Sequence, residues 1–251
     1  MLKGLMKGVS FFSVISAAPK LTVPRAVASG SLMNKQPIAA IFDVDGTLLG
    51  GASMEVRFLQ YLWRYGELRV SDIRRLAAGI FRTAAQGHAI IRANKAYLHG
   101  KPLDHYRRLA HDCFDQHIRH HLLPKAVARV RWHQQQGHCV VLVSGTLDLL
   151  LEPLALHLNA CTRIGTKIET EGNALLGKIA GVQPYDKGKA TTMLALNQVR
   201  NFDLAKSFAY GNHFTDRYLL GVVGHPVATN PDYRLRGFAA KHGWMIEEFG
   251  K

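Results

Sequence analysis

Cysteine is scarce in this chain of 251 residues, and Cys113, Cys139 and Cys161 are scattered with no C-x-x-C pair. Their scarcity excludes a disulfide scaffold and a zinc knuckle, and a reducing compartment is the default expectation. No stretch of 18 or more apolar residues occurs, which excludes an ordinary transmembrane helix. With 47% hydrophobic and 20% charged residues, the chain is neither disordered nor a coiled coil.

Acidic residues are few: 18 Asp and Glu stand against 32 Lys and Arg, which gives a formal net charge of +14. This balance favours anionic partners, namely nucleic acid, an anionic membrane surface or phosphorylated substrates. The basic residues are spread along the chain, so we do not expect a nucleic-acid surface. We expect a small phosphorylated substrate and a cytoplasmic location, and the sequence leaves the oligomeric state open.

Residues 1–36 differ from the rest of the chain because they contain five basic residues and no acidic one. We interpret this segment as a disordered or targeting extension, since Met33, just before the first strand, would itself make a natural start. The alternative is a membrane-surface helix or an export signal, which leaves open a peripheral membrane contact through residues 1–20.

Short apolar strands alternate with helical patterns in the remainder, which predicts a doubly wound parallel α/β sheet with a Rossmann-like core. The expected strands cover residues 38–42, 138–143, 207–210, 227–229 and 245–246. The expected helices cover residues 125–136, 146–158, 188–200 and 231–242. A turn signal at 171–173 predicts a small hairpin between strands at 161–168 and 175–180.

Residues 51–124 interrupt this alternation, because helical spacing of apolar residues continues there and no strand pattern intervenes. The segment includes helical patterns at 88–98 and 103–121. We therefore predict an all-helical cap inserted after the first strand. The expected organisation is an N-terminal extension at 1–36, an α/β core at 37–50 and 125–251, and the cap at 51–124.

Polar and acidic residues gather where three of the predicted strands end. Asp43 and Asp45 follow the first strand, and Ser144 follows the second. Asn212 and Asp216 follow the third. In a doubly wound sheet, ligands bind in the crevice beyond these ends. Two nearby acids allow one carboxylate to attack a phosphoryl group while the other moves protons, and a cation such as Mg²⁺ reduces the repulsion between the anions.

Four elements follow one another along the chain: IFDVDGTLL (41–49), VLVSGT (141–146), the lysine in YDKGKATTML (185–194), and AYGNHFTDRYLLGVVGHPVATNPD (209–232). In this order they resemble the motifs of the haloacid dehalogenase-like superfamily, and within it the phosphoserine-phosphatase-like branch. The similarity runs from about residue 37 to 247 and includes the cap inserted after the first motif. It implies a Mg²⁺-dependent phosphomonoester hydrolase that forms an aspartyl-phosphate intermediate.

By that resemblance, Asp43 is the nucleophile and Asp45 is the general acid/base, whose main-chain carbonyl also contacts Mg²⁺. Lys189 neutralises the charge shared by Asp43 and the phosphoryl group. Lys187 is the alternative, since Lys-Gly-Lys allows a two-residue slip, but Lys189 places Met193 better on the apolar side of the following helix.

The resemblance also implies that Thr47, Ser144 and Gly145 serve phosphate binding. Thr47 orients the first motif, and Ser144 hydrogen-bonds the transferring phosphoryl oxygens. Ser144 or Thr146 would also act as the N-cap of the helix expected after them, and a capped helix N-terminus is itself an anion site.

One position departs from the family pattern, because the last motif there begins Gly-Asp and this chain has Gly211-Asn212. The implied metal ligands are therefore Asp43, Asp45, Asn212 and Asp216, and the amide supplies an oxygen without negative charge. We expect a working enzyme that binds Mg²⁺ more weakly. The alternative is a weakly active or non-catalytic phospho-ligand-binding protein of the same fold.

Several histidines fall in the predicted cap, including the i, i+4 pair His117 and His121. No nearby acid or cysteine completes a zinc site with them, so we expect them to be solvated or at the edge of the core. His213 differs, since it lies inside the last motif and is placed to face the substrate.

The preferred substrate is predicted not to be phosphoserine. Family members that act on it hold the substrate ammonium with a glutamate shortly after the first motif, and Glu55 comes about three residues later than that position. Three helical residues correspond to about 5 Å, which is too far for the same contact unless the preceding loop is rearranged. The basic excess and the N-terminal segment favour a more anionic, or lipid-derived, phosphomonoester.

Overall fold

The computed structural model describes residues 36–84 and 95–250 of the chain. The extension expected at 1–36, and with it the membrane contact through residues 1–20, therefore lies outside the described residues except for Gln36. Among the residues described, no helix combines the length and the apolar character that crossing a membrane requires.

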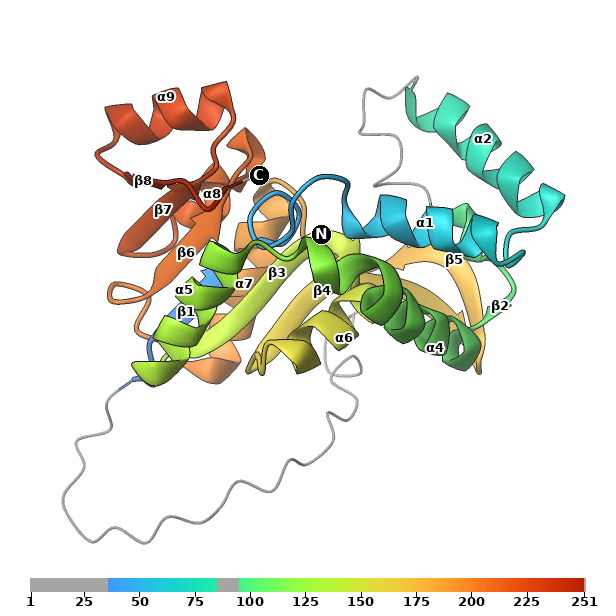
Figure 1. Ribbon diagram of the computed structural model, residues 1–251, viewed down its shortest axis with the longest axis horizontal. Coiled ribbons are helices and arrows are strands. Elements are labelled where there is room, and N and C mark those ends of the chain that lie inside the picture. Colours follow the sequence, from blue (N-terminus) through green and yellow to red (C-terminus); the bar gives the residue numbers. More distant parts are fainter. Residues whose placement is uncertain (1–35, 85–94, 251) are drawn as a thin grey trace, which may run out of the picture. The chain divides into compact units, whose positions relative to one another are not determined.

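An eight-stranded sheet forms the centre of the fold (Figure 1), in the order β2-β5-β4-β3-β1-β6-β7-β8. The strands are β1 (Ala39–Phe42), β2 (Lys101–Pro102), β3 (Cys139–Leu147), β4 (Thr162–Glu171), β5 (Ala174–Ala180), β6 (Phe208–Gly211), β7 (His225–Thr229) and β8 (Met245–Glu247). The six strands from β4 to β8 in this order pair in parallel. β5 pairs antiparallel with β4, and β2 pairs antiparallel with β5. The order reverses at β1, which is the topological switch point of the sheet.

Helices cover both faces of the parallel strands. They are α5 (Pro124–Gln135), α6 (Asp148–His157), α7 (Lys187–Arg200), α8 (Arg217–Leu220) and α9 (Tyr233–Lys241). Ala40 and Phe42 of β1 belong to the hydrophobic cluster formed with α5 and α6, and Ala39 and Ile41 belong to the cluster formed with α7, α8 and α9. Successive side chains of a strand point to opposite faces, so β1 is buried on both sides. The predicted doubly wound sheet is confirmed.

The start of α6 differs from the sequence prediction. Strand β3 continues through Ser144 and Thr146 to Leu147, and α6 begins at Asp148 with Leu147 as its N-cap and no side-chain capping bond. The expectation that Ser144 or Thr146 caps this helix is therefore wrong. Both residues are part of the strand, and this places their side chains two positions apart on one side of it.

The insertion after β1 is mostly helical and lies at the β5 end of the sheet in Figure 1. It contains α1 (Met54–Arg64), α2 (Val70–Ala84) and α4 (Leu103–Cys113), followed by a π-helical turn at 114–118 and a 3₁₀ turn at 119–121. Of the helix predicted at 88–98, only 95–98 is described, and it contains a 3₁₀ turn (Ala96–Leu98).

One short strand also lies within this insertion. β2 pairs antiparallel with β5, and the flanking amides of Gly100 and Leu103 donate to the carbonyls of Leu175 and Asn173. The expectation of an all-helical cap is wrong at this point. Two residues are too few to produce a recognisable alternation in the sequence.

Candidate active site

The carboxyl ends of β1, β3 and β6 bring the sequence motifs together. Phe42 pairs with Leu142 on one side and with Tyr210 on the other, so the residues that follow leave the sheet at one edge. A cavity of about 160 Å³ lies there. Its lining includes these residues expected from the sequence: Asp43, Asp45, Ser144, Gly145, Lys189, Asn212, His213 and Asp216.

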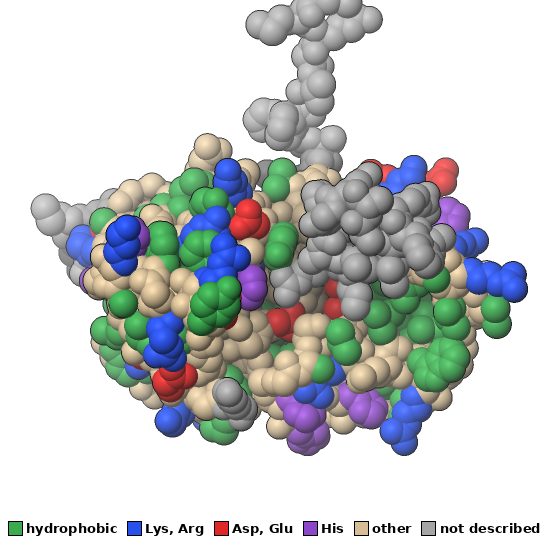
Figure 2. Space-filling view, turned by 90° about the horizontal axis from the view of Figure 1, so that it is seen from above, with side chains coloured by type: hydrophobic (Ala, Val, Ile, Leu, Met, Phe, Trp, Pro, Cys, Tyr) green, Lys and Arg blue, Asp and Glu red, His purple; other side chains and the backbone are tan. Residues whose placement is uncertain are grey.

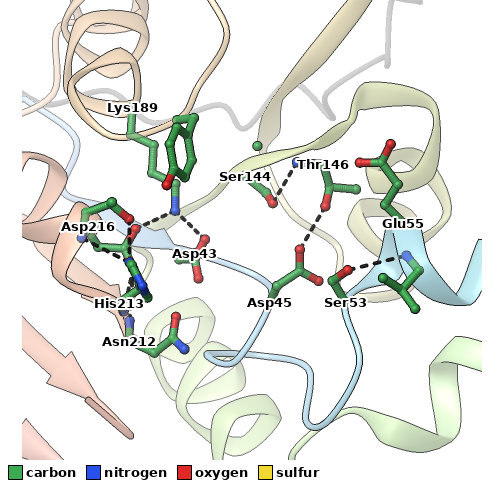
Figure 3. A pocket seen from close by; sticks show the side chains of 14 residues that line it. Asp43, Asp45, Ser53, Glu55, Ser144, Thr146, Lys189, Asn212, His213 and Asp216 are labelled. Atoms are coloured by element: carbon green, nitrogen blue, oxygen red, sulfur yellow. Dashed lines mark hydrogen bonds and ion pairs between the residues drawn. The ribbon is translucent and has the colours of Figure 1, made fainter. Parts of the chain in front are cut away.

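Lys189, in the first turn of α7, reaches between two carboxylates (Figure 3). Its Nζ donates to Asp43 Oδ1 at 2.5 Å and to Asp216 Oδ1 at 2.6 Å, and all three residues are buried. Burial favours the neutral amine, but the charges of Asp216 and Asp43 outweigh it and raise the pKa of Lys189. Lys187 instead places its Nζ 5.5 Å from the centroid of the Tyr218 ring. The structure thus brings Lys189 to the site and directs Lys187 elsewhere.

Asp43 is surrounded by more negative than positive charge. Burial raises its pKa to about 6, with Asp216 and Asp45 adding to the rise and Lys189 opposing it. Thr47 donates to Asp43 Oδ2 at 3.1 Å, so hydrogen bonds fix both carboxylate oxygens. The side chain is held in one orientation at the end of β1, as a nucleophile requires.

Thr47 is fully buried and is not among the residues that line the cavity. Its hydroxyl oxygen lies 3.1 Å from Asp43 Oδ2 and 3.5 Å from Asn212 Oδ1. It therefore lies behind the carboxylate and orients it, and the geometry gives it no direct access to a phosphoryl group in the cavity.

Asp45 is held by donors from two different elements. Its Oδ1 accepts the main-chain N–H of Met54, the first residue of α1, at 2.8 Å. Its Oδ2 accepts the hydroxyl of Thr146 at 2.9 Å. Sequence reasoning assigned no catalytic role to Thr146, although its spacing of two from Ser144 would have placed both on one face of a longer β3.

Asp216 organises the loop that follows β6. Its Oδ1 accepts from Lys189, and its Oδ2 accepts the main-chain N–H groups of Asn212 at 3.1 Å and His213 at 2.9 Å. The side chain of Asn212 packs against Gly46, where an added Cβ would lie 2.0 Å from Asn212 Nδ2. Gly46 also has φ of +83°, so glycine both permits this turn and leaves room for the amide.

Comparison with known proteins agrees with this geometry. The model of the haloacid dehalogenase-like hydrolase family matches residues 40–221. The chain belongs to this family. A phosphoserine phosphatase of Mycobacterium tuberculosis (strain ATCC 25618 / H37Rv) is 26% identical over 242 residues, which cover 90% of this chain and 77% of that protein.

Two further similarities extend over most of this haloacid dehalogenase-like hydrolase. A histidinol-phosphatase of Neisseria meningitidis serogroup C (strain 8013) is 28% identical over 84% of this chain and 98% of its own length. A crystal structure of a protein with unknown function from Bordetella pertussis Tohama I gives a TM-score of 0.74 at 24% identity. It covers 86% of this chain and 100% of that one, which shows a shared fold.

The donor set of this hydrolase suits Mg²⁺. Asp43 offers a carboxylate, Asp45 a main-chain carbonyl and Asn212 an amide oxygen, and Mg²⁺ prefers oxygen ligands. Three carboxylates near a single lysine leave excess negative charge, which a divalent cation would offset. Within the described part of the chain, no group of three or more His, Cys, Asp and Glu side chains could hold a metal. The fit therefore depends on the carbonyl and the amide.

Glu55 of α1 lines the same cavity, on the far side of Asp45 from Lys189 (Figure 3). The argument that Glu55 lies too far along the helix is therefore wrong, because the loop at 50–53 brings the start of α1 beside Asp45. The carboxylate is buried and forms an ion pair with Lys95, and Tyr97 Oη lies 3.4 Å from its Oε1. Sequence reasoning missed Lys95, since lysine is normally exposed.

Proposed function

We propose that this hydrolase is a Mg²⁺-dependent phosphomonoester phosphatase that forms an aspartyl-phosphate at Asp43. The observation that carries the proposal is the placement of two carboxylates in one cavity with different partners. Asp43 forms an ion pair with Lys189, whereas Asp45 is oriented by a hydroxyl and a main-chain amide. Two carboxylates in different environments suit a nucleophile and a proton-transfer group.

The reaction proceeds in two halves. An oxygen of Asp43 bonds to phosphorus while the bond from phosphorus to the ester oxygen breaks, and Asp45 gives that oxygen its proton. A water then attacks phosphorus, Asp45 takes the water's proton, and the carboxylate of Asp43 leaves with inorganic phosphate as the product. Lys189 offsets charge at Asp43 throughout, and Ser144 and the Gly145 amide contact the phosphoryl oxygens.

Asp43, the main-chain carbonyl of Asp45 and Asn212 would hold the metal ion. Asp216 supports them by fixing the loop that presents Asn212. When bound, Mg²⁺ reduces the repulsion between the phosphoryl group and the carboxylates around it.

The substrate that this geometry supports is a small phosphorylated metabolite, as the names of the two phosphatase relatives suggest. A cavity of about 160 Å³ favours a small leaving group over a lipid-derived one. Because Lys95 already compensates Glu55, the described residues at that end of the cavity offer neither a free anion for an ammonium group nor a free cation for a second acidic group. We therefore propose a leaving group that is uncharged and forms hydrogen bonds.

This preference can be measured directly. With Mg²⁺ present, kcat/KM for phosphoserine should fall at least about tenfold below that of the best phosphomonoester with an uncharged leaving group, a difference of about 1.4 kcal/mol in transition-state binding. A panel of phosphorylated metabolites, including lipid phosphates, supplies the comparison. If phosphoserine or a lipid phosphate proves best by tenfold, the argument from the compensated Glu55 is wrong.

The covalent step is tested by acid quenching of the enzyme with a ³²P-labelled substrate from that panel. We expect an acid-stable phosphoprotein that hydroxylamine cleaves, and no label on the Asp43→Asn variant. Turnover without such a species would contradict the aspartyl-phosphate. Tight binding of the phosphomonoester with no turnover would instead support the non-catalytic alternative that Asn212 raises.

A further inference from the structure

A second pocket, of about 230 Å³, shares no lining residue with the catalytic cavity. It lies between α1 and the π-helical and 3₁₀ turns that follow α4. Its basic and amide-bearing lining includes Arg57, Arg64, Gln116, His117, His120 and His121, and no Asp or Glu is among the described residues that line it. Figure 2 shows histidine and basic side chains gathered along the lower edge of the face seen there.

The local structure explains why these side chains converge. Arg57 and Arg64 are seven residues apart on α1, which places them two turns apart on the same side of the helix. Opposite them, the helix winds more widely at 114–118, and this π-helical turn carries Gln116 and His117. Such turns change the direction of side chains relative to an ordinary α-helix and are frequent at functional sites.

Among the described residues, the arginines that face this pocket form no ion pair, although Asp45 is close enough to Arg57 to raise its pKa against the effect of burial. Arg64 forms no ion pair with any residue that the structure describes, and Arg57 donates to the neutral carbonyls of Ala52 at 3.1 Å and Gly50 at 3.2 Å. The buried Nε2 of His117 has no hydrogen-bond partner among the residues described. Buried polar atoms are nearly always hydrogen-bonded in native proteins, so this atom leaves a hydrogen-bonding capacity unused beside the pocket. The His117 ring also packs against the rings of Tyr61 and Tyr65.

Two further observations agree. Gln116 Oε1 accepts the hydroxyl of Tyr65 at 3.1 Å, which leaves the amide N–H groups of Gln116 as donors. The pKa of His121 is lowered by burial and by the positive charge of Arg57 and His120. Among the described residues that line it, the pocket therefore holds crowded positive charge and several donors, with no anionic group to match them.

We propose that this pocket binds a phosphate-like oxyanion, separate from the phosphoryl group that reacts at Asp43. A guanidinium presents two parallel donors that match two oxygens of such an anion, and the His117 and Gln116 donors would contact the others. The anion can be free inorganic phosphate, which is the product of the proposed reaction, or the phosphoryl group of a metabolite. Because Arg57 also holds Gly50 and Ala52, the pocket contacts the loop between Asp45 and α1.

Calorimetric titration of the full chain with inorganic phosphate, and separately with methylphosphonate, tests this proposal. We expect two binding sites per chain in the wild type. Arg64→Gln should weaken one of them at least about tenfold, since a charged hydrogen bond to an anion is lost, and Arg64→Glu should abolish it. The matched control is Arg131→Gln, which removes an exposed arginine of α5 outside the pocket. Tighter binding of phosphate than of methylphosphonate identifies the free ion as the ligand, and the reverse identifies a phosphoryl group on a carbon chain.

A tungstate soak locates the anion, with an anomalous peak expected between Arg64 and His117 in addition to any peak near Lys189. The proposal is overturned if tungsten occupies the catalytic cavity alone, or if Arg64→Gln and Arg131→Gln bind phosphate equally well. Arg64 is exposed and unpaired, so its variants should retain the wild-type Tm. Both experiments measure anion binding, so their outcome does not depend on whether the enzyme hydrolyses a phosphomonoester at Asp43.

Discussion

At each end of the catalytic cavity, a carboxylate that lines it is paired with a buried lysine, but the charge balance differs. At one end, Lys189 is shared between Asp43 and Asp216. At the other end, Lys95 forms an ion pair with Glu55. Both lysines are almost completely buried. Burying charge is unfavourable unless partners compensate it, so the number of carboxylates per lysine decides what each end can do.

This difference in charge balance suggests separate roles, with the Lys189 end suited to the reaction and the Lys95 end suited to binding the leaving group. The end with Lys189 retains excess negative charge, which calls for a cation, and burial there raises the pKa of Asp43 to about 6. At the other end, the charge of Lys95 is matched by that of Glu55, so the described residues there contribute shape and hydrogen bonds without a net charge. The four variants below test this contrast, beginning with the largest expected effect.

The Asp43→Asn variant should lose more than about 99% of turnover, because an amide is a far poorer nucleophile and removal of a nucleophile usually lowers kcat by several orders of magnitude. The two side chains have nearly equal volume, so the circular dichroism spectrum should not change. Steady-state kinetics with the best substrate provides the measurement. Residual activity above one hundredth of wild type would rule out the covalent role.

The Glu55→Gln variant should lower the free energy of unfolding by about 3 kcal/mol, because it removes the carboxylate that pairs with the buried charge of Lys95. Replacing both residues by methionine should restore most of that stability, since no isolated charge remains. Urea denaturation measures both effects. Glu248→Gln is the control, because Glu248 pairs with Arg236 on the surface and its loss should change stability by less than about 1 kcal/mol. Equal losses in Glu55→Gln and the control would disprove a compensated buried pair.

The Thr146→Val variant should lower kcat about tenfold, because it removes the hydroxyl that orients Asp45, and proton transfer depends on that orientation. Thr146→Ser retains the hydroxyl and should keep most of the activity, which separates orientation from packing. KM should change little in either variant. If valine and serine have the same effect, Thr146 serves packing alone.

The Asn212→Asp variant should lower the Mg²⁺ concentration for half-maximal activity several-fold, since it supplies an anionic ligand in place of a neutral one. Asn173→Asp adds the same charge in the turn between β4 and β5, away from the site, and should leave that concentration unchanged. A concentration that stays the same or rises in Asn212→Asp would show that residue 212 does not contact the metal.

The sequence predicted the Lys189 end of the cavity far better than the Lys95 end. Asp43, Ser144 and Asn212 follow strands whose apolar runs are unmistakable, and parallel strands deliver their carboxyl ends to one edge. Lys189 was found through a motif at the start of a helix. Local patterns therefore sufficed for the three residues at strand ends, and the family resemblance was needed to add Lys189.

The other end depends on tertiary structure that local patterns do not encode. Glu55 reaches the cavity because of the conformation of the loop at 50–53, and loop conformation is poorly determined by composition. Lys95 pairs in the protein interior with Glu55, which lies 40 residues earlier in the chain. Thr146 was missed because the end of β3 was placed four residues too early, at 143 instead of Leu147. β2 was missed because a two-residue strand has no periodicity.

The hydrogen bond from the Met54 amide ties the orientation of Asp45 to the first residue of α1. The carboxylate that moves protons in the proposed mechanism is therefore held by the cap insertion as well as by the motif at the end of β1. A substitution that shifts the start of α1 would then slow the chemical step without changing any reacting group.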